Sequence, residues 1–446
     1  MFYLGIDIAK NTHVASLMND TGKTVFKGFS FSNSTEGAKS LLEIIKKYSE
    51  FTDVTVGMEA TGHYWLSIYS FLYDYNFSAI HVINPIQTDG WRKGAEIRKR
   101  KNDIIDSVLI ADLIRYGNFV ETTLSNEDLF SLRNICRMRN YLVQSTGDLK
   151  RKIICVLDQV FPEYQTIFSN TLGTTSKQLL LDFSSPADFE ELSVDVLTET
   201  LENLSRKKIG QNTAEKLINS AKNSFGVTFS KESFTFQLKL LIEQVKFIES
   251  QIKDCEHKIK ELMEKINSPI TTIPGIGPVT GAIIISEFGD ISRFDKPSKL
   301  VAFAGIDATV SQSGEFDGTH NVMSKRGSPY LRKALFQAAL VASNSDPVLK
   351  AYYQKKRAEG KHHKTCVGAV ARKLCNIIYA ILKNDKPYEV PKQWFLPLTY
   401  FTNEFCFQNS FIKYVHFYLE NFIKFFSKYY WLFIVGLSYI NLIKKK

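Results

Sequence analysis

An unbroken three-and-four spacing of apolar residues over residues 238–266 constrains this chain more than any other feature. Such a spacing, sustained for about four heptads with charged residues between, predicts a long helix with one apolar face. The sequence therefore predicts a coiled coil within or between chains, although an ordinary bundle helix satisfies the same pattern. The positions concerned are Leu238, Leu241, Val245, Ile248, Ile252, Cys255, Ile259, Leu262 and Ile266.

The length of 446 residues and the changes in composition predict several domains. We expect an α/β domain over residues 1–120 and a helical region over 121–268, which contains a second long helix and a polar insert. A mainly α domain, rich in glycine and small apolar residues, follows over 269–391. The tail over 392–446 is rich in aromatic residues and lysine and has no assigned role. Its apolar run of about 13 residues is shorter than the ~20 that span a bilayer, so we expect no membrane anchor.

The first 120 residues alternate between strand and helix patterns. Three strands joined by short turns, over 2–9, 13–18 and 24–31, predict an antiparallel meander. Helices are expected over 34–49, 62–75 and 103–116, with strands over 54–58 and 78–83. This order of elements predicts an RNase H-like α/β domain.

Four carboxylates follow these elements in a suggestive order. Asp7 and Glu59 end two apolar strands, and Asp103 and Asp106 lie three residues apart on one helix face. Acids that converge in this way repel one another unless a hard divalent cation such as Mg²⁺ neutralises them. Each acid alone has a plainer explanation, as a turn acid, a surface residue or a helix N-terminal acid. Their combination predicts a metal site.

The net charge of +10 and the pI of about 9.0 suit a nucleic acid or an anionic membrane surface. A basic segment with Trp91 nearby suits a nucleic-acid backbone with base stacking, although a solvated loop is the alternative. It comprises Arg92, Lys93, Arg98, Lys99, Arg100 and Lys101. The six cysteines form no CxxC pair, which disfavours zinc and disulfide frameworks. We therefore expect free thiols, no signal peptide and a cytoplasmic, nucleoid-associated protein.

Two segments of the 269–391 domain carry phosphate-binding features. Gly275 and Gly277, flanked by prolines, predict a helix-hairpin-helix element that grips DNA, or else a packing turn. Farther on, the basic residues Lys325, Arg326, Arg332 and Lys333 surround a helix start and suit phosphate. Ser313, beside Gly314 in a polar loop, is chemically available as a nucleophile but by itself reads as a turn serine.

Several motifs in order resemble the DEDD-type transposases of the insertion-sequence-110 family, to which the pilin-gene invertases are similar. These motifs are GIDIAK, MEATG and KNDIIDS in residues 1–120, and IPGIGPVTG, FAGIDATVSQSG, SKRGSPYLRKAL and GKHHKTCVGAVARKL in residues 270–390. Two positions depart from the family pattern, because Asn102 and Ser107 stand where it usually has threonine and alanine. Neither departure removes an acid.

The resemblance implies a RuvC-like fold in which Asp7, Glu59, Asp103 and Asp106 are Mg²⁺ ligands. It implies a serine that attacks DNA and forms a covalent phosphoserine link; Ser313 matches that serine best, with Ser311 as the alternative. It also implies a structured guide RNA and a homo-oligomer, a dimer or tetramer, in which one subunit's acids meet another's serine.

The hypothesis from the sequence is therefore Mg²⁺-dependent DNA cleavage and rejoining without ATP, consistent with the lack of a GxxxxGK[ST] motif. Two alternatives remain. One is a junction-resolving, metal-dependent nuclease in which water attacks. The other is a non-catalytic DNA- or RNA-binding protein.

Overall fold

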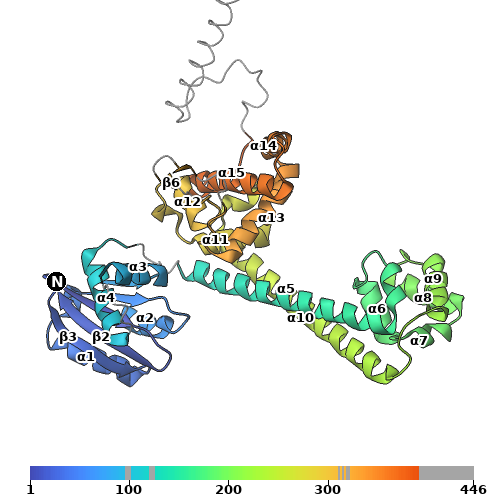
Figure 1. Ribbon diagram of the computed structural model, residues 1–446, viewed down its shortest axis with the longest axis horizontal. Helices are drawn as coiled ribbons and strands as arrows, with labels where there is room; N and C mark the ends of the chain where they lie inside the picture. Colours follow the sequence, from blue (N-terminus) through green and yellow to red (C-terminus); the bar gives the residue numbers. More distant parts are fainter. Residues whose placement is uncertain (96–101, 120–125, 310–311, 314–315, 318–321, 391–446) are drawn as a thin grey trace, which may run out of the picture. The chain divides into compact units, whose positions relative to one another are not determined.

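The computed structural model describes residues 1–95, 102–119, 126–309, 312–313, 316–317 and 322–390 (Figure 1). The chain divides into two compact units, Met1–Tyr388 and Glu389–Lys446. Almost all of the second unit, with the predicted tail, lies outside the described residues.

The N-terminal part contains a five-stranded sheet with the order β3-β2-β1-β4-β5. Strands β1 (Phe2–Asp7), β2 (Thr12–Asn19) and β3 (Thr24–Ser32) form the predicted antiparallel meander. Strands β4 (Val54–Glu59) and β5 (Ala79–Ile83) extend it in parallel with β1. The sheet is therefore mixed, and its central strand β1 is antiparallel to β2 on one side and parallel to β4 on the other.

Helices cover both faces of this sheet. The apolar faces of α1 (Thr35–Lys46) and α2 (Trp65–Tyr73) share one core with β1 and β4, and a single 3-10 turn (Phe51–Asp53) precedes β4. Helix α4 (Asp103–Tyr116) covers the other face and shares a core with Trp91 of α3 (Pro85–Ala95). Helix α3 departs from our expectation, because no helix was predicted between β5 and α4.

Two glycines let α4 lie directly on the sheet. A Cβ at Gly5 would lie 2.0 Å from the carbonyl oxygen of Ser107, and one at Gly57 would lie 2.7 Å from the side chain of Ile114. The start of α4 lies over β3 and β2, because a Cβ at Gly28 would lie 3.1 Å from Ile104 and the hydroxyls of Ser16 and Ser107 are 2.8 Å apart. Helix α4 therefore crosses the sheet from β3 to β4, at the level of Gly5 and Gly57.

The two long helices pack against each other within the chain. The start of α5 (Glu127–Val160) shares a core with the end of α10 (Lys231–Ile266), and the end of α5 shares another with the start of α10. The pair is therefore antiparallel. The buried residues of α10 are Leu238, Ile242, Val245, Ile259 and Met263, whereas the middle positions Ile248, Ile252 and Cys255 are only half-buried. The predicted helix is present, and supercoiling of the pair stays a prediction.

The insert folds as a small helical body on the far ends of α5 and α10. Its elements are the 3-10 helix Pro162–Thr166, α6 (Thr174–Asp182), α7 (Pro186–Glu190), α8 (Val194–Ser205) and α9 (Gln211–Lys222). Its core is centred on the fully buried rings of Phe161, Tyr164 and Phe189 and includes apolar residues of both long helices. The insert is thus predicted correctly as helical.

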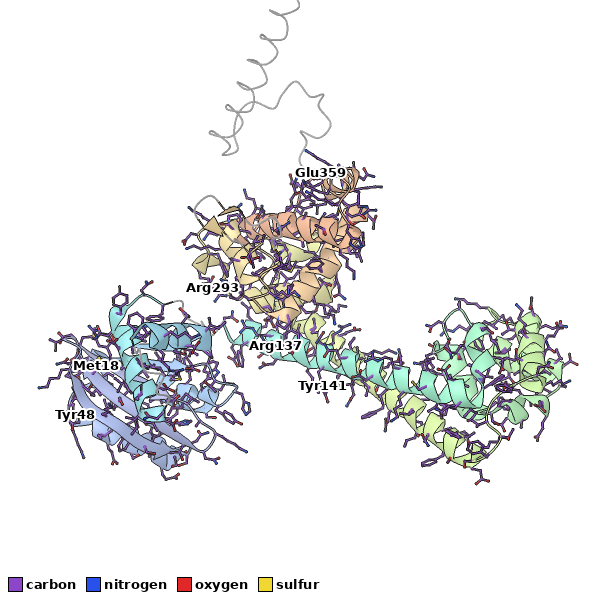
Figure 2. All side chains as sticks on the ribbon, in the orientation of Figure 1. Met18, Tyr48, Arg137, Tyr141, Arg293 and Glu359 are labelled. Atoms are coloured by element: carbon purple, nitrogen blue, oxygen red, sulfur yellow. The ribbon has the colours of Figure 1, made fainter. Side chains whose placement is uncertain are left out.

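The C-terminal part is mainly α, as expected. Its elements are the 3-10 helices Pro269–Thr272 and Ile291–Arg293, α11 (Pro278–Phe288), α12 (Pro297–Phe303), β6 (Gln312–Ser313), β7 (Phe316–Asp317), α13 (Pro329–Ser345), α14 (Pro347–Ala358) and α15 (His363–Asn384). Among the described helices α15 alone has the length and apolar character to cross a membrane, and more than half of its apolar stretch is buried in this core. A buried core helix meets the same criteria. Arg293 lies over the rings of Phe294 and Phe303 at 4.7 and 4.6 Å (Figure 2).

Candidate functional site

Two of the predicted acids end neighbouring parallel strands at the same level. Ile6 of β1 pairs with Met58 of β4, so Asp7 and Glu59 occupy the next position on each strand. Side chains alternate along a strand, and Gly5 and Gly57 both face α4. Asp7 and Glu59 therefore lie on the α4 side of the sheet, at the C-terminal ends of β1 and β4.

The carboxylate of Glu59 is held by two threonine hydroxyls. Thr61 Oγ1 donates to Glu59 Oε1 at 3.0 Å, and Thr88 Oγ1 donates to Glu59 Oε2 at 2.7 Å. Thr61 lies in the loop after β4, whereas Thr88 comes from α3 and is buried. Glu59 is thus fixed from both sides of the sheet edge.

The two acids of α4 lie in different environments. Asn102 caps the helix by accepting a hydrogen bond from the Ile105 amide at 2.8 Å, which sets the first turn. Asp103 is exposed, whereas Asp106 is only 5% exposed. Arg92 of α3 donates to Asp106 Oδ1 through Nε at 3.1 Å and lies 2.9 Å from it through Nη2. The predicted pair shares a helix face, but Asp106 is buried against Arg92 whereas Asp103 is exposed.

Helix α3 links two of the acids. Thr88 and Arg92 are four residues apart and so lie on one face of the helix. That face therefore meets both Glu59 and Asp106. Sequence reasoning gave Thr88 no role and assigned Arg92 to a nucleic-acid-binding segment; no local pattern indicated that either side chain contacts an acid.

The residues brought together have the chemistry of a hard-cation site. Asp7, Glu59 and Asp106 offer carboxylate oxygens, the ligands that Mg²⁺ prefers. Within the described part of the chain, however, no group of three or more acidic, histidine or cysteine side chains is arranged to hold a metal ion. In this conformation Thr88 and Arg92 engage the oxygens of Glu59 and Asp106. These carboxylates suit a divalent cation by their chemistry. In this conformation, however, they are positioned to bond with Thr88 and Arg92.

The basic segment is only partly described. Arg92 and Lys93 lie on α3, where Lys93 pairs with Asp89 at 2.6 Å, and Trp91 Nε1 donates to Asp112 Oδ2 at 3.2 Å. Arg98, Lys99, Arg100 and Lys101 lie outside the described residues. The described part of the segment is therefore helical, and its side chains contact acids of α3 and α4.

The two glycines of the predicted helix-hairpin-helix differ in their surroundings. Gly275 has a φ of +93°, and a Cβ there would lie 2.7 Å from the amide nitrogen of Ala342 in α13. Gly277 caps α11, is exposed, and has nothing within 4 Å of a Cβ built on it. Gly275 therefore serves packing, while Gly277 presents open backbone at a helix N-terminus.

Ser313 lies in a short antiparallel hairpin rather than the expected loop. It pairs with Phe316 across β6 and β7, and Ala308 bridges Met323 lower in the same hairpin. At the base, Lys325 donates its amide to the Gly305 carbonyl at 3.0 Å. Ser311, the alternative nucleophile, lies outside the described residues. The backbone thus places Ser313 at the end of β6, opposite Phe316 of β7.

The basic residues after this hairpin lie at its base and on α13. Lys325 has a φ of +54°, and both it and Arg326 are exposed. Arg332 Nη1 donates to the Gly327 carbonyl at 3.1 Å. Ser328 caps α13, as predicted, by accepting from the Leu331 amide at 3.4 Å. Exposed cations therefore accompany the hairpin that carries Ser313.

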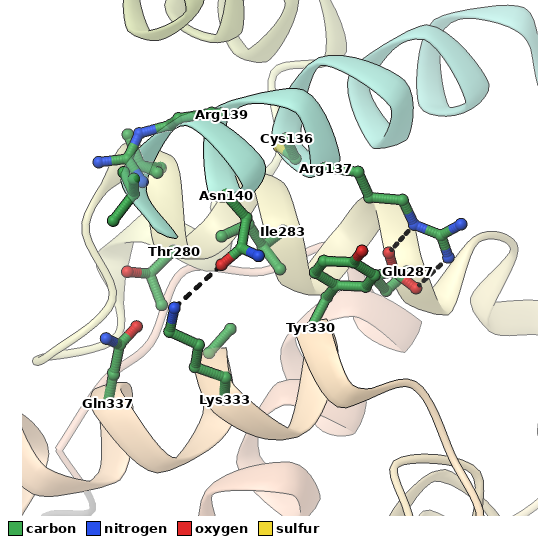
Figure 3. A pocket seen from close by; sticks show the side chains of 13 residues that line it. Cys136, Arg137, Arg139, Asn140, Thr280, Ile283, Glu287, Tyr330, Lys333 and Gln337 are labelled. Atoms are coloured by element: carbon green, nitrogen blue, oxygen red, sulfur yellow. Dashed lines mark hydrogen bonds and ion pairs between the residues drawn. The ribbon is translucent and has the colours of Figure 1, made fainter. Parts of the chain in front are cut away.

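A pocket of about 260 Å³ lies where α5 meets α11 and α13 (Figure 3). The Arg137 guanidinium forms two hydrogen bonds with the Glu287 carboxylate, at 2.7 and 3.0 Å, and lies 5.2 Å from the ring centre of Tyr330. Lys333 donates to Asn140 at 2.9 Å on the opposite side. Burial raises the pKa of the Cys136 thiol, which lines the pocket, to about 12. That thiol is therefore protonated near neutral pH. The contacts of Arg137 and Lys333 join α5 to α11 and α13 of the C-terminal part.

Two stretches of the chain match transposase families. Residues 4–162 match a DEDD-type transposase family named for IS110, and residues 267–354 match a family described as Transposase IS116/IS110/IS902. Together these matches cover more than half of the chain and include all four acids and Ser313.

Named relatives extend the similarity over most of the chain. A protein of insertion element IS116 from Streptomyces clavuligerus is 24% identical over 392 residues, 86% of this chain and 95% of the relative. The pilin gene-inverting protein of Moraxella bovis is 24% identical over 389 residues, 87% of this chain and 97% of the relative. A protein of insertion element IS110 from Streptomyces coelicolor is 32% identical over 124 residues, 27% of this chain and 30% of the relative.

Proposed function

The chain belongs to the transposase family of insertion elements IS110 and IS116, an enzyme family that acts on DNA, and we propose that its acids and Ser313 form a cleavage-and-rejoining site. The acids are Asp7, Glu59, Asp103 and Asp106. The observation that carries the proposal is the approach of Glu59 and Asp106 to one face of α3, with Asp7 level with Glu59. The strand order β3-β2-β1-β4-β5 supports an RNase H-like, RuvC-like domain around them.

The four acids would hold Mg²⁺ at the edge of the sheet. A bound divalent cation neutralises such carboxylates and polarises the oxygens of a scissile phosphate. Asp106 is buried and so loses most of its hydration, which favours a cation partner. Asp103, exposed one turn earlier, is the ligand free to reach outward.

Ser313 supplies the nucleophile. Its Oγ attacks the scissile phosphorus, a phosphoserine bond forms, and the bond to the 3′ oxygen breaks. The serine proton passes to a nearby base, and the departing 3′ oxygen takes up a proton. A 3′-hydroxyl of the exchanged strand then attacks the phosphoserine and releases the serine, so the number of phosphodiester bonds is preserved and no ATP is consumed.

The partners proposed are the element's DNA ends and target, a structured guide RNA and a second copy of the chain. Gly277, Lys325, Arg326 and Arg332 would contact phosphates, together with the basic segment 98–101, whereas the packing of Gly275 leaves it a supporting role. In an oligomer the hairpin of one subunit would meet the acids of another.

The test is a denaturing gel of labelled element-end DNA with full-length protein, Mg²⁺ and co-expressed element RNA. Wild type should give a slow, protease-sensitive adduct that is lost in Ser313→Ala and kept in Ser311→Ala. Asp7→Asn should lower adduct formation at least 100-fold, since an electrostatic contribution of this size is typical of such sites. Cleaved ends without an adduct would instead indicate attack by water, and an adduct that survives Ser313→Ala but not Ser311→Ala would move the nucleophile to Ser311.

A further inference from the structure

The Arg92 guanidinium forms an ion pair with Asp106, the buried acid of this site. Two of its nitrogens lie 3.1 and 2.9 Å from the same oxygen, Asp106 Oδ1. The side chains of Arg92 and Asp106 are 18% and 7% exposed, so water screens the pair weakly. Asp89, one turn earlier on α3, lies 3.6 Å from Nη1 of the same guanidinium.

We infer that Arg92 occupies the position on Asp106 that a divalent cation takes, and that it thereby sets the metal affinity of the site. The inference rests on the proposed role of Asp106 as a ligand. A guanidinium and a metal ion cannot both lie close to one carboxylate oxygen without strong repulsion. Metal binding at Asp106 therefore requires Arg92 to withdraw.

The arrangement of α3 couples this exchange to a second acid. Thr88, on the same helix face as Arg92, donates to Glu59 at 2.7 Å. If Glu59 and Asp106 both held a divalent cation, the contacts of Thr88 and Arg92 with these acids would both have to give way. Trp91, next to Arg92, donates to Asp112 of α4 at 3.2 Å and so reports on the contact between the two helices.

If Arg92 positioned Asp106 for the metal instead of competing with it, substitution of Arg92 would change the metal affinity in the opposite direction. If Arg92 held Asp106 in a metal-binding orientation, its removal would weaken binding, as the loss of an outer partner of a ligand does. If Arg92 competes with the cation, its removal strengthens binding, because neither an ion pair nor a neighbouring positive charge opposes the metal. The direction in which the metal affinity changes when Arg92 is replaced therefore distinguishes the two roles.

The experiment is Mn²⁺ binding to the full-length protein, measured by electron paramagnetic resonance of the free ion, without DNA. Arg92→Gln should lower the Kd about tenfold, a size typical of a partly buried charge contact. Arg92→Lys, which keeps the charge, should stay within about threefold of wild type. Thr88→Val, which removes only an uncharged contact on Glu59, should change the Kd less than Arg92→Gln does.

Further measurements distinguish an error in the role of Arg92 from an error in the assignment of Asp106 as a ligand. Asp106→Asn should abolish the tight binding in both backgrounds; equal Mn²⁺ binding by wild type and Asp106→Asn would overturn this inference and the assigned ligand together. A Kd unchanged or raised by Arg92→Gln, with Asp106 still required, would overturn this inference alone. Mg²⁺ should also change the Trp91 emission of wild type, with Trp91→Phe as the blank, and should raise the unfolding midpoint of Arg92→Gln more than that of wild type.

Discussion

Arg137 of α5 and Glu287 of α11 form a two-hydrogen-bond ion pair, with Nε–Oε1 at 2.7 Å and Nη2–Oε2 at 3.0 Å (Figure 3). The Glu287 side chain is only 5% exposed, while that of Arg137 is 45% exposed. The hydrogen bonds to Glu287 raise the pKa of Arg137 against the opposing effect of its burial. The pair therefore satisfies a buried carboxylate at the junction between the long helices and the C-terminal part.

Arg137→Met should lower the free energy of unfolding by about 2 kcal/mol. Removing one partner of a fully buried pair costs about 3–5 kcal/mol, and the solvent exposure of Arg137 reduces that figure. The matched control is Arg139→Met, whose partner Glu256 has a side chain 39% exposed, and which should cost less than about 1 kcal/mol. Urea unfolding measures both. A double variant, Arg137→Met with Glu287→Leu, should recover most of the loss, and equal costs for Arg137 and Arg139 would contradict the argument.

Gly5→Ala should destabilise the N-terminal part by about 3 kcal/mol or more. Its Cβ would lie 2.0 Å from a backbone oxygen and 2.5 Å from a backbone nitrogen of α4, which cannot move aside as a side chain can. Gly90→Ala, on α3 with nothing within 4 Å of the new Cβ, should instead raise stability by about 0.5 kcal/mol or more through helix propensity. Thermal unfolding followed by Trp65 fluorescence measures both, and a tolerated Gly5→Ala would show that α4 does not lie this close to β1.

Alanine substitutions at Gly275 and Gly277, which precede α11, should have different effects: the first on stability and the second on DNA binding. Gly275→Ala meets the backbone of α13 at a left-handed φ and should lower the unfolding free energy by about 2 kcal/mol or more. Gly277→Ala should leave stability within about 0.5 kcal/mol and weaken DNA binding, since its backbone is open to a phosphate. Filter binding at several salt concentrations, with the unfolding curve as the control, tests the pair; unaltered DNA affinity in Gly277→Ala would remove this hairpin from the interface.

Helices and strands that depend on local residue patterns were predicted correctly from the sequence. The helix predicted over residues 103–116 is α4, which the structure places at Asp103–Tyr116. The apolar alternation of the strands gave the sheet, and Ser328 gave the start of α13. Heptad spacing predicted α10, but such spacing indicates only that one face of the helix is buried. It could not state that α5 of the same chain covers that face.

The least predictable part of the site was α3. Gly90 and Gly94 lower its intrinsic helix propensity, so the stretch resembled a basic loop. The acids themselves were recognisable, because they end strands or begin a helix. The partners Thr88 and Arg92 were not, since their contacts with Glu59 and Asp106 arise only when α3 folds against the sheet edge. Tertiary packing, rather than a local motif, sets the charge balance of this site.

The last prediction concerns pH and rests on His13, which is fully buried in β2. Its Nδ1 accepts a hydrogen bond from the Ala9 amide at 3.3 Å, and its ring meets Phe31 edge-on with 5.2 Å between centres. Burial lowers the pKa of His13 from its ordinary 6.5, against a smaller opposing effect of a hydrogen bond with Asn33. The folded state therefore binds a proton less readily than the unfolded state does.

Below about pH 6.5 the unfolded chain gains a proton at this position that the folded chain does not, so stability is lost as the pH falls toward the lowered pKa. Acids such as Glu163 and Glu249, whose pKa values are also lowered, act only below about pH 4.5 and leave this window clear. Urea unfolding followed by Trp65 fluorescence at about pH 7.5, 6.5 and 5.5 should show the decline. His13→Phe keeps an aromatic ring against Phe31 and cannot titrate, so its decline should be smaller. A pH dependence unaltered in His13→Phe would assign the effect to another group.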